Sequence, residues 1–442
     1  MTNEKLSSLW TTGLDGMSGI KNLLMKPLYI IAISFLCIAC NTKDDNQKKL
    51  DFMEFDFHFD TESNEMPYNF SSYWDTFPTN VDRTAWEFAK IGNIERMHEI
   101  WDTKESIEIR LTQEQRDSFG LYKAMDAIDY IVKEAEEHQV VIINEAHQMP
   151  QHRIFTTRLL EELKRRGYKH LGMEGYYNTP QADSIMQANG YPTLNSGYYY
   201  TQDPQFGNLI RTAFDMGFNI FGYESSGHAN GKEREINQAR NIESYLNRYP
   251  NEKILIHCGF DHVYEGDMPN NSMGWGKAMA GRLTEFTGLD PLTISQTIYS
   301  EKGNRDYENS YYQITDLERP SIFVNESGEL FGQQRKEASL DLPPMGTFRY
   351  DIAVFHPRSK KYDRPQWMVY GDRKEVELSF VEENIQCPCL VLAYRKGEKV
   401  GKAVPYDIQE TDDKKVTLVL DKSDFEIVIL NQKNIALKAE FN

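Results

Sequence analysis

The stretch VVIINEAHQMPQHRIFTTRLLEELKRRG, Val140–Gly167, decides the fold that we expect. It opens with four apolar, β-branched residues typical of a buried strand, and a helical pattern of apolar residues begins near Pro150. Between them, Glu145 and His147 stand at the carboxyl end of the strand. Ligands bind at this end in open α/β sheets, because the strand-to-helix turns converge there and the next helix presents free N–H groups. The stretch therefore predicts a functional site at this edge.

The alternation of apolar runs and helical patterns continues to residue 296 and predicts a parallel sheet with flanking helices, an α/β fold. We expect strands at residues 140–143, 170–174, 218–223, 253–256 and 292–295. Because the carboxyl ends of parallel strands meet at one edge of a sheet, polar side chains that follow them should lie close together. The side chains in question are Glu145, His147, Glu174, Glu224, His257, His262 and Gln296.

The rest of the chain divides by composition. We expect a signal peptide at 1–39, a polar tether at 40–75, a charged helical segment at 76–138 and the α/β domain at 139–340, which includes two short strand-like runs within 311–325. Runs of period two within 345–442 predict a small antiparallel, β-sandwich-like domain. Its expected strands are near 348–355, 367–370, 376–381, 390–394, 416–420 and 425–430.

The leader carries the signals of an exported lipoprotein. Residues 27–39 form an apolar run that is too short to span a bilayer, and lysines precede it, as in a signal peptide with Met25 as an alternative start. The run closes on LCIAC, which resembles a bacterial lipoprotein box with Cys40 as the lipidated residue. The following NTKDD resembles the surface-export tag of some Bacteroidota lipoproteins. We therefore expect a protein anchored in the outer membrane, on either the surface or the periplasmic side.

Charge and cysteine content narrow the expected partners. The formal net charge is −18, and loss of residues 1–39 removes three lysines and two acids, which changes it to −19. Such an acidic surface repels nucleic acid, so we expect a small-molecule ligand or substrate, and the sequence leaves the oligomeric state open. Cys258, Cys387 and Cys389 predict neither a disulfide framework nor a zinc site.

Several of these residues resemble a known family. Glu145-Ala146-His147, then Pro150 and His152, look like the opening motif of the ChaN-type haem-uptake lipoproteins, which group with the Tiki and TraB proteins and the erythromycin esterases. Met173-Glu174 and GFDH at 259–262 resemble later elements of that group. The resemblance covers residues 140–296 and implies the fold of that group. Its members bind haem, use a metal or hydrolyse an ester, so the fold alone does not select among these functions.

A hydrolytic interpretation gives these residues roles. His147 would be the general base that takes a proton from water, and Glu145 or Glu174 would orient its imidazole. Arg153 and His262 would stabilise an oxyanion. In a metal-assisted version, a divalent ion would activate the water, and its ligands would be His147, His262, Glu145 and Glu174.

Two alternatives stay open. Haem binding would use the tyrosine-rich passage after the second strand, above all Tyr176, Tyr177 and Tyr198. A non-catalytic surface binding module is the other alternative. Four further residues have ordinary structural interpretations: His152 as a helix cap, His257 as a core residue, Glu224 as part of a polar loop and Arg282 as a surface charge.

Overall fold

The computed structural model describes residues 50–62, 66–176, 178–179, 187–225, 231–268, 273–332, 350–380 and 385–441. The expected signal peptide, Cys40 and Tyr177 lie outside these ranges. Residues 47–442 group into one compact unit, which is the unit described below. Within the described ranges, no helix is both long enough and apolar enough to cross a membrane.

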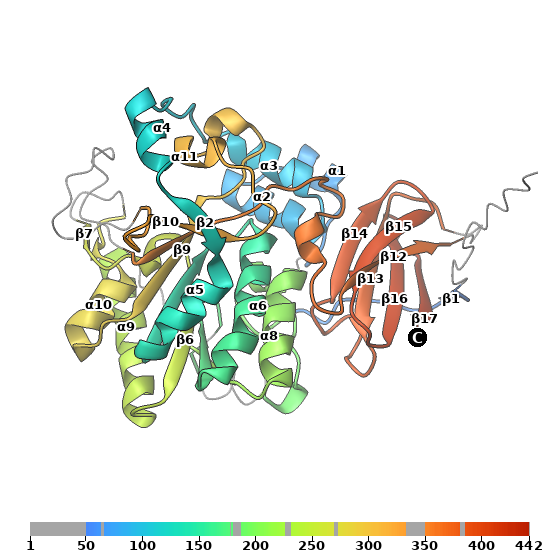
Figure 1. The fold of residues 1–442 in the computed structure, drawn as a ribbon. Helices are drawn as coiled ribbons and strands as arrows, with labels where there is room; N and C mark the ends of the chain where they lie inside the picture. Colours follow the sequence, from blue (N-terminus) through green and yellow to red (C-terminus); the bar gives the residue numbers. More distant parts are fainter. Residues whose placement is uncertain are drawn as a thin grey trace, which may run out of the picture. The chain divides into compact units, whose positions relative to one another are not determined.

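The main sheet has eight strands in the order β2-β10-β11-β9-β3-β6-β4-β5 (Figure 1). All five strands that the sequence predicted are present, and each pairs with its neighbour in parallel. The central strand β3 is buried along its whole length, as its continuous apolar run requires. These five strands are β3 (Val140–Glu145), β4 (Tyr168–Met173), β5 (Asn219–Gly222), β6 (Lys253–Gly259) and β9 (Leu292–Tyr299).

Three further strands extend the sheet beyond β9. β11 (Ile352–Phe355) pairs in parallel with β9, whereas β10 (Ser321–Val324) and β2 (Lys123–Asp126) add an antiparallel edge. The sequence had placed residues 348–355 in the small β domain. That prediction was wrong because all four residues of β11 are apolar and become buried in the main sheet. Of the two strand-like runs expected in 311–325, one is β10 and the other contains the short helix α11 (Ser310–Gln313).

Helices cover both faces of the main sheet, which makes three layers (Figure 1). α5 (Ala127–Glu134), α6 (Pro150–Arg165) and α8 (Pro204–Asp215) bury their apolar faces on one side. α9 (Gly231–Arg248) and α10 (Met279–Thr287) cover the other side. The helix α6 begins at Pro150, whose fixed φ and missing N–H suit the first turn of a helix.

The N-terminal segment packs beside the carboxyl end of β3. It contains α1 (Ser71–Thr76), α2 (Val81–Lys90), α3 (Ile94–Asp102) and α4 (Gln113–Phe119). Phe88 and Trp101 of these helices share an apolar cluster with Ala146 and Met149, the residues that follow β3. This packing brings α2 to the edge of the sheet at which the sequence predicts a site.

The C-terminal domain consists of two antiparallel sheets. One has the order β1-β17-β16-β13-β14, and the other pairs β12 with β15. Residues 367–370, which the sequence predicted as a strand, begin within the 3-10 helix η5 (Gln366–Met368) instead. Cys387 and Cys389 form a disulfide, which the sequence analysis had not predicted. The strands are β1 (Met53–Glu54), β12 (Lys374–Ser379), β13 (Cys389–Arg395), β14 (Asp407–Thr411), β15 (Lys415–Leu420), β16 (Phe425–Asn431) and β17 (Ala436–Phe441).

Short elements complete the described fold. Two of them, η2 and η3, lie at the edge where the predicted site residues stand. They are η1 (Ala135–Glu137), η2 (Tyr199–Gln202), η3 (Phe260–Val263), η4 (Arg305–Tyr307), β7 (Asp267–Met268) and β8 (Gly276–Lys277).

A buried ion pair joins the α/β part to the C-terminal domain. Arg211 of α8 donates from Nε to Oε1 of Glu398 at 2.7 Å and from Nη2 to Oε2 at 2.5 Å. Both side chains are buried, at 2% and 7% exposure. Arg211 also donates to the carbonyl oxygen of Val404. The pair therefore fixes α8 against the loop between β13 and β14.

Arg211→Met should destabilise the protein strongly, because it leaves the Glu398 carboxylate buried without its cation. Loss of one partner of a buried pair costs about 3–5 kcal/mol. The free energy of unfolding in urea measures this loss. The control is Arg165→Met, which removes an exposed pair with Glu161 and should cost less than about 1 kcal/mol. Equal losses in the two variants would contradict this account.

Candidate functional site

The carboxylate of Glu145, at the end of β3, lies at the centre of a buried cluster. Arg153 in the first turns of α6 donates from Nε to Oε2 at 2.7 Å and from Nη2 to Oε1 at 2.8 Å. The same guanidinium lies 2.9 Å from Asp203, the cap of α8, and donates to the carbonyl oxygen of His147 at 2.7 Å. Burial raises the pKa of Glu145, but Arg153, His257 and His147 outweigh it and hold the pKa well below its usual range. Glu145 is therefore ionised.

His147 hydrogen-bonds to Glu145 through one ring nitrogen. Its Nδ1 lies 2.8 Å from Oε1 of Glu145, so the ionised carboxylate holds the proton on Nδ1. Among the described residues, Nε2 has no hydrogen-bond partner, and the side chain keeps 11% exposure. Aromatic rings hold the imidazole in place. It stacks on Tyr200 with centroids 4.1 Å apart and meets the edges of Trp86 and Phe260.

The imidazole of His147 and the carboxylate of Glu174 converge over Gly259, at the end of β6. A Cβ at position 259 would lie 2.7 Å from Nε2 of His147 and 3.3 Å from Oε2 of Glu174. The backbone N–H of Gly259 donates to the same carboxylate oxygen. Only glycine leaves room for this approach. Its φ of −90° is open to any residue, so glycine is needed here for space and not for its backbone conformation. Two of the predicted site residues are thus brought together by a third strand.

Arg234, in the first turn of α9, bridges two predicted carboxylates. Its Nε lies 3.0 Å from Oε1 of Glu224, its Nη2 lies 2.6 Å from Oε2 of Glu224, and Nη2 also pairs with Glu174. The side chain keeps 27% exposure, while its Nε, Nη1 and Nη2 each contact a neighbouring side chain. Burial raises the pKa of Glu174, but His262 and Arg234 outweigh it, and the pKa lies well below its usual range.

His262, within η3, lies between two carboxylates. Its Nδ1 is 2.8 Å from Oε2 of Glu235, and its Nε2 is 3.3 Å from Oε1 of Glu174. Burial lowers its pKa, but the two carboxylates outweigh burial and raise the pKa to about 10. Its Nε2 also lies 2.8 Å from Nη1 of Arg234. The raised pKa favours the protonated ring, and Arg234 and His262 both contact the carboxylate of Glu174.

Other predicted residues have structural positions. The His152 Nδ1 accepts from the backbone N–H of Ala146 at 3.0 Å, which caps the turn after β3. Burial lowers the pKa of His257 to about 4, so it is neutral beside Glu145. The amide of Gln296 binds the backbone oxygen of Asn144 at 2.7 Å. Arg282 pairs with Glu285 on the surface of α10.

The tyrosines proposed for haem binding occupy different environments. Tyr176 is buried at 2% exposure and packs against Phe206. Tyr198 is 37% exposed, and Tyr200 forms the wall on which His147 stacks. Tyr200, rather than Tyr176 or Tyr198, thus contacts the Glu145–His147 pair.

The carboxylates proposed as metal ligands are already engaged. Within the part of the chain that the structure describes, no three His, Cys, Asp or Glu side chains are arranged to hold a metal ion. Arg153 occupies both oxygens of Glu145, and Arg234 lies between Glu174 and Glu224. In this conformation the carboxylates are therefore bound by arginines, an arrangement that suits them less well to coordinate a metal ion.

A small cavity lies near the end of β3, although His147 itself does not line it. It has a volume of about 220 Å³, and Ala146 and Gln148, the neighbours of His147, contribute to its lining. Phe260 borders both the cavity and the imidazole, and it adopts a φ of 39°, a backbone region that costs a residue with a side chain about 1–3 kcal/mol. Such strain is often found at functional sites.

Sequence reasoning missed Arg234, Glu235 and Tyr200. Arg234 and Glu235 lie in the first turn of a charged helix, and such a helix ordinarily has a solvated face. Their position could have identified them. The helix α9 follows the strand that ends at Glu224, so its first turn must lie at the same edge of the sheet. Tyr200 stood within the tyrosine-rich passage, but nothing in the sequence distinguished it from its neighbours.

Gly259→Ala should displace the imidazole of His147. The added methyl group would lie 2.5 Å from its Cε1, and overpacking of this kind costs about 1–3 kcal/mol. Urea unfolding measures the cost, and the histidine NMR signals report the displacement. Gly120→Ala, at the exposed end of α4, is the control. An unchanged His147 signal in Gly259→Ala would contradict the close approach.

The cationic state of His262 predicts a pH dependence. Its pKa is about 10 in the folded protein and about 6.5 in an unfolded chain, so the folded state binds the extra proton between these values. Stability from this group is complete below pH ~6.5 and is lost as the pH rises towards 10. The difference in unfolding free energy between wild type and His262→Asn should therefore shrink over this window. A constant difference would contradict the assignment.

Comparisons with known proteins give distant structural similarities only. No family model and no curated protein matches the chain. The chain is similar to the type III effector HopBA1, with 14% identity over 40% of this chain and 86% of that one, at a TM-score of 0.27. It is also similar to RRSP, a MARTX toxin effector domain from Vibrio vulnificus CMCP6, with 15% identity, 48% and 44% coverage and a TM-score of 0.29. A structure described as bacterial protein toxins gives 15% identity, 51% and 46% coverage and a TM-score of 0.31. The chain spans less than half the length of these last two, and similarities of this extent decide nothing about activity.

Proposed function

We propose that the Glu145–His147 pair activates water for the hydrolysis of an ester or amide bond. The observation that carries the proposal is the state of the imidazole. Its Nδ1 is held by an ionised carboxylate at 2.8 Å, and among the described residues its Nε2 has no partner. A histidine in this state can take a proton from water through Nε2, while Glu145 stabilises the imidazolium that forms.

The remaining charges have complementary roles in this reaction. Attack of water on a carbonyl places negative charge on its oxygen. Arg234 keeps 27% exposure, and its guanidinium and the neighbouring His262 carry positive charge at the same edge of the sheet. These cations would stabilise the oxyanion. Arg153, by contrast, is fully buried behind Glu145, so we assign it the positioning of Glu145 in place of direct contact with the substrate.

The cavity lined by Ala146 and Gln148, the neighbours of His147, would accept a polar group of the substrate. Three buried atoms of its lining have no hydrogen-bond partner within the described ranges: Nε1 of Trp101, Nε2 of His98 and Oε1 of Gln148. Trp101 and Phe260 are parallel, with centroids 6.0 Å apart. Burial and then Lys302 lower the pKa of His98 to about 4, so His98 is neutral. The cavity thus offers neutral hydrogen-bonding groups and aromatic surface beside the ion pair of Lys302 with Glu105 and the carboxyl group of Glu301.

The proposed location rests on the sequence of the leader. The resemblance of residues 36–40 to a lipoprotein box supports a lipid anchor at Cys40. The site would then act on small molecules at the bacterial envelope.

His147→Gln should abolish most hydrolysis by the chain from residue 41 onward. Loss of a general base lowers kcat by roughly 10²–10⁴-fold. A panel of chromogenic esters and anilides, assayed with wild type and variant, measures it. His138→Gln is the matched control, since His138 precedes β3 at its opposite end and its ring binds the backbone oxygen of Asp290. Activity that survives His147→Gln would contradict the proposal.

Two further measurements distinguish the alternatives to a metal-free base. A stoichiometric divalent metal that is lost in His147→Ala would replace water activation by histidine with metal-assisted activation. A haem absorbance band that is lost in Tyr198→Phe would support haem binding instead. A metal-free histidine base requires neither a bound metal nor a haem band.

A further inference from the structure

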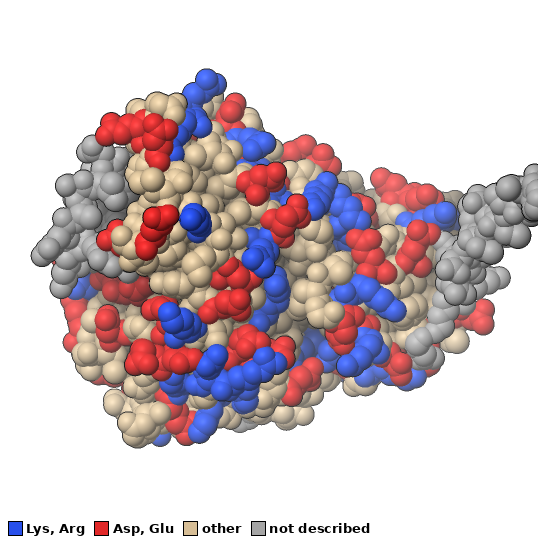
Figure 2. Space-filling model, viewed as in Figure 1, with Lys and Arg blue, Asp and Glu red and all other residues tan. Residues whose placement is uncertain are grey.

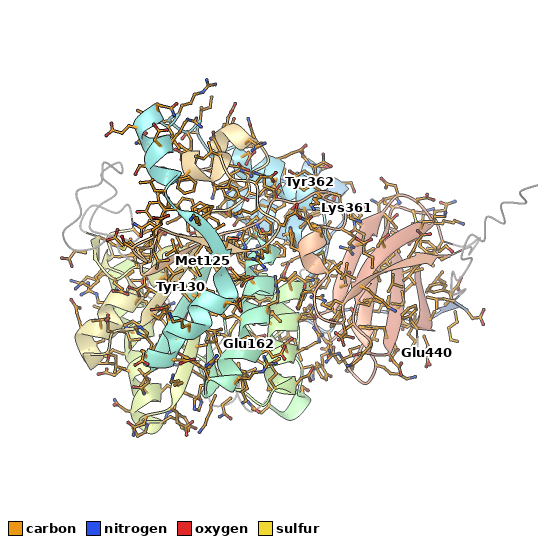
Figure 3. All side chains as sticks on the ribbon, in the orientation of Figure 1. Met125, Tyr130, Glu162, Lys361, Tyr362 and Glu440 are labelled. Carbon is orange, nitrogen blue, oxygen red and sulfur yellow. A yellow bond between two sulfur atoms is a disulfide. The ribbon has the colours of Figure 1, made fainter. Side chains whose placement is uncertain are left out.

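A second hollow lies apart from the His147 site. It has a volume of about 940 Å³ and lies between the helices α6 and α8 and residues 366–373 and 421–423 of the C-terminal part. None of the catalytic residues proposed above lines it. Figure 3 shows Glu162, one of its lining residues, on α6, and Figure 2 shows acidic and basic side chains mixed across this face. We call this hollow the α6–α8 groove.

The α6–α8 groove is lined by an unusual buried arginine. Four arginines are buried within the described ranges: Arg153, Arg211, Arg364 and Arg373. Three of them have a carboxylate partner, at 2.7 Å for Arg153, 2.5 Å for Arg211 and 3.0 Å for Arg364. Arg373, at 5% exposure, has no carboxylate within 4.0 Å among the described residues. Burial of a charge without a counter-ion is costly, so this arginine calls for an explanation.

The hydrogen bonds of Arg373 leave part of its guanidinium unsatisfied. Its Nη1 donates to Oε1 of Gln205 and to the hydroxyl of Tyr370, both at 3.0 Å. Its Nε and Nη2 are buried and, in the described structure, have no partner. These two nitrogens lie on one edge of the guanidinium fork, the edge that receives a carboxylate or phosphate in two parallel hydrogen bonds.

The acidic side chains of the lining each form an ion pair: Glu161, Glu162, Asp215, Glu318, Asp372 and Asp421. Other groups of the groove suit an anionic ligand. Arg158 of α6 is partly exposed in the groove, and no ion pair is found for it among the described side chains. Nδ1 of His356 and Oε1 of Gln151 also lack partners there and offer neutral hydrogen bonding. Trp367 and Tyr370 add aromatic surface, against which a sugar ring packs well.

We propose that the α6–α8 groove binds an acidic sugar whose carboxylate pairs with Nε and Nη2 of Arg373. The sugar ring would lie against Trp367 and Tyr370, and Arg158 would supply the second positive charge. The Tyr370 ring lies 5.1 Å from the guanidinium and bonds to it, so it covers the arginine in the unliganded protein. This proposal is independent of the hydrolytic site.

Isothermal titration of the chain from residue 41 onward with glucuronate tests the proposal, with glucose and inorganic phosphate as comparison probes. Wild type should bind glucuronate saturably and should not bind glucose. Arg373→Met should lose at least tenfold in affinity, and Arg158→Gln should lose several-fold. His147→Gln should bind as wild type does, which separates this site from the catalytic one. Arg240→Gln, which removes an exposed arginine of α9, is the charge control.

Three results would overturn the proposal. The first is the absence of saturable glucuronate binding, and the second is equal affinity in wild type and Arg373→Met. The third is phosphate binding as tight as glucuronate binding, because the sugar would then play no part in recognition.

Thermal unfolding gives a second measurement. Without ligand, Arg373→Met should melt no lower than wild type, because it removes a buried charge that has no carboxylate partner, and glucuronate should raise the melting temperature of wild type but not of Arg373→Met. Arg373→Lys keeps the charge but loses the fork, so it should bind with intermediate affinity.

Discussion

The buried pair of Glu145 and Arg153 is the interaction on which the rest of the site depends. The guanidinium binds both carboxylate oxygens of Glu145, the carboxylate of Asp203 and the backbone oxygen of His147. One side chain thus ties together the end of β3, the start of α6 and the start of α8. Since Glu145 is held ionised in this way, it can fix the tautomer of His147 and leave the other ring nitrogen available.

Some groups of the site are held by ion pairs, and others are left to contact a substrate. The carboxylates of Glu145, Glu174 and Glu224 are each bound by an arginine, and His262 is held between two carboxylates. These groups set the electrostatic field and change little during a reaction, as preorganised catalysis requires. Nε2 of His147 remains for a substrate, and the partly exposed side chain of Arg234 lies at the same edge of the sheet. The same comparison of paired and unpaired arginines identifies Arg373 as the exception outside the site.

The sequence was sufficient to predict the five central strands and their common edge, because a buried parallel strand needs a continuous apolar run. That edge brought Glu145, His147, Glu174, Glu224 and His262 into one cluster. The resemblance to the ChaN-type proteins and the erythromycin esterases, together with the lipid anchor, stays a prediction. The sequence was insufficient for β11, whose short apolar run suits either sheet, and for Arg234, whose partners come from two other strands. Long-range pairing of this kind leaves no periodic signal in the chain.

The protonation state of His147 tests the central claim most directly. Nitrogen-15 NMR of the histidine side chains, assigned by comparison with His147→Gln, distinguishes the two neutral tautomers at a pH where the ring is uncharged. The geometry predicts the proton on Nδ1, donated to Glu145, and an unprotonated Nε2. A proton on Nε2 with a bare Nδ1 would contradict the account, because Nε2 would then have no lone pair with which to accept a proton from water, and the bare Nδ1 would face the carboxylate of Glu145.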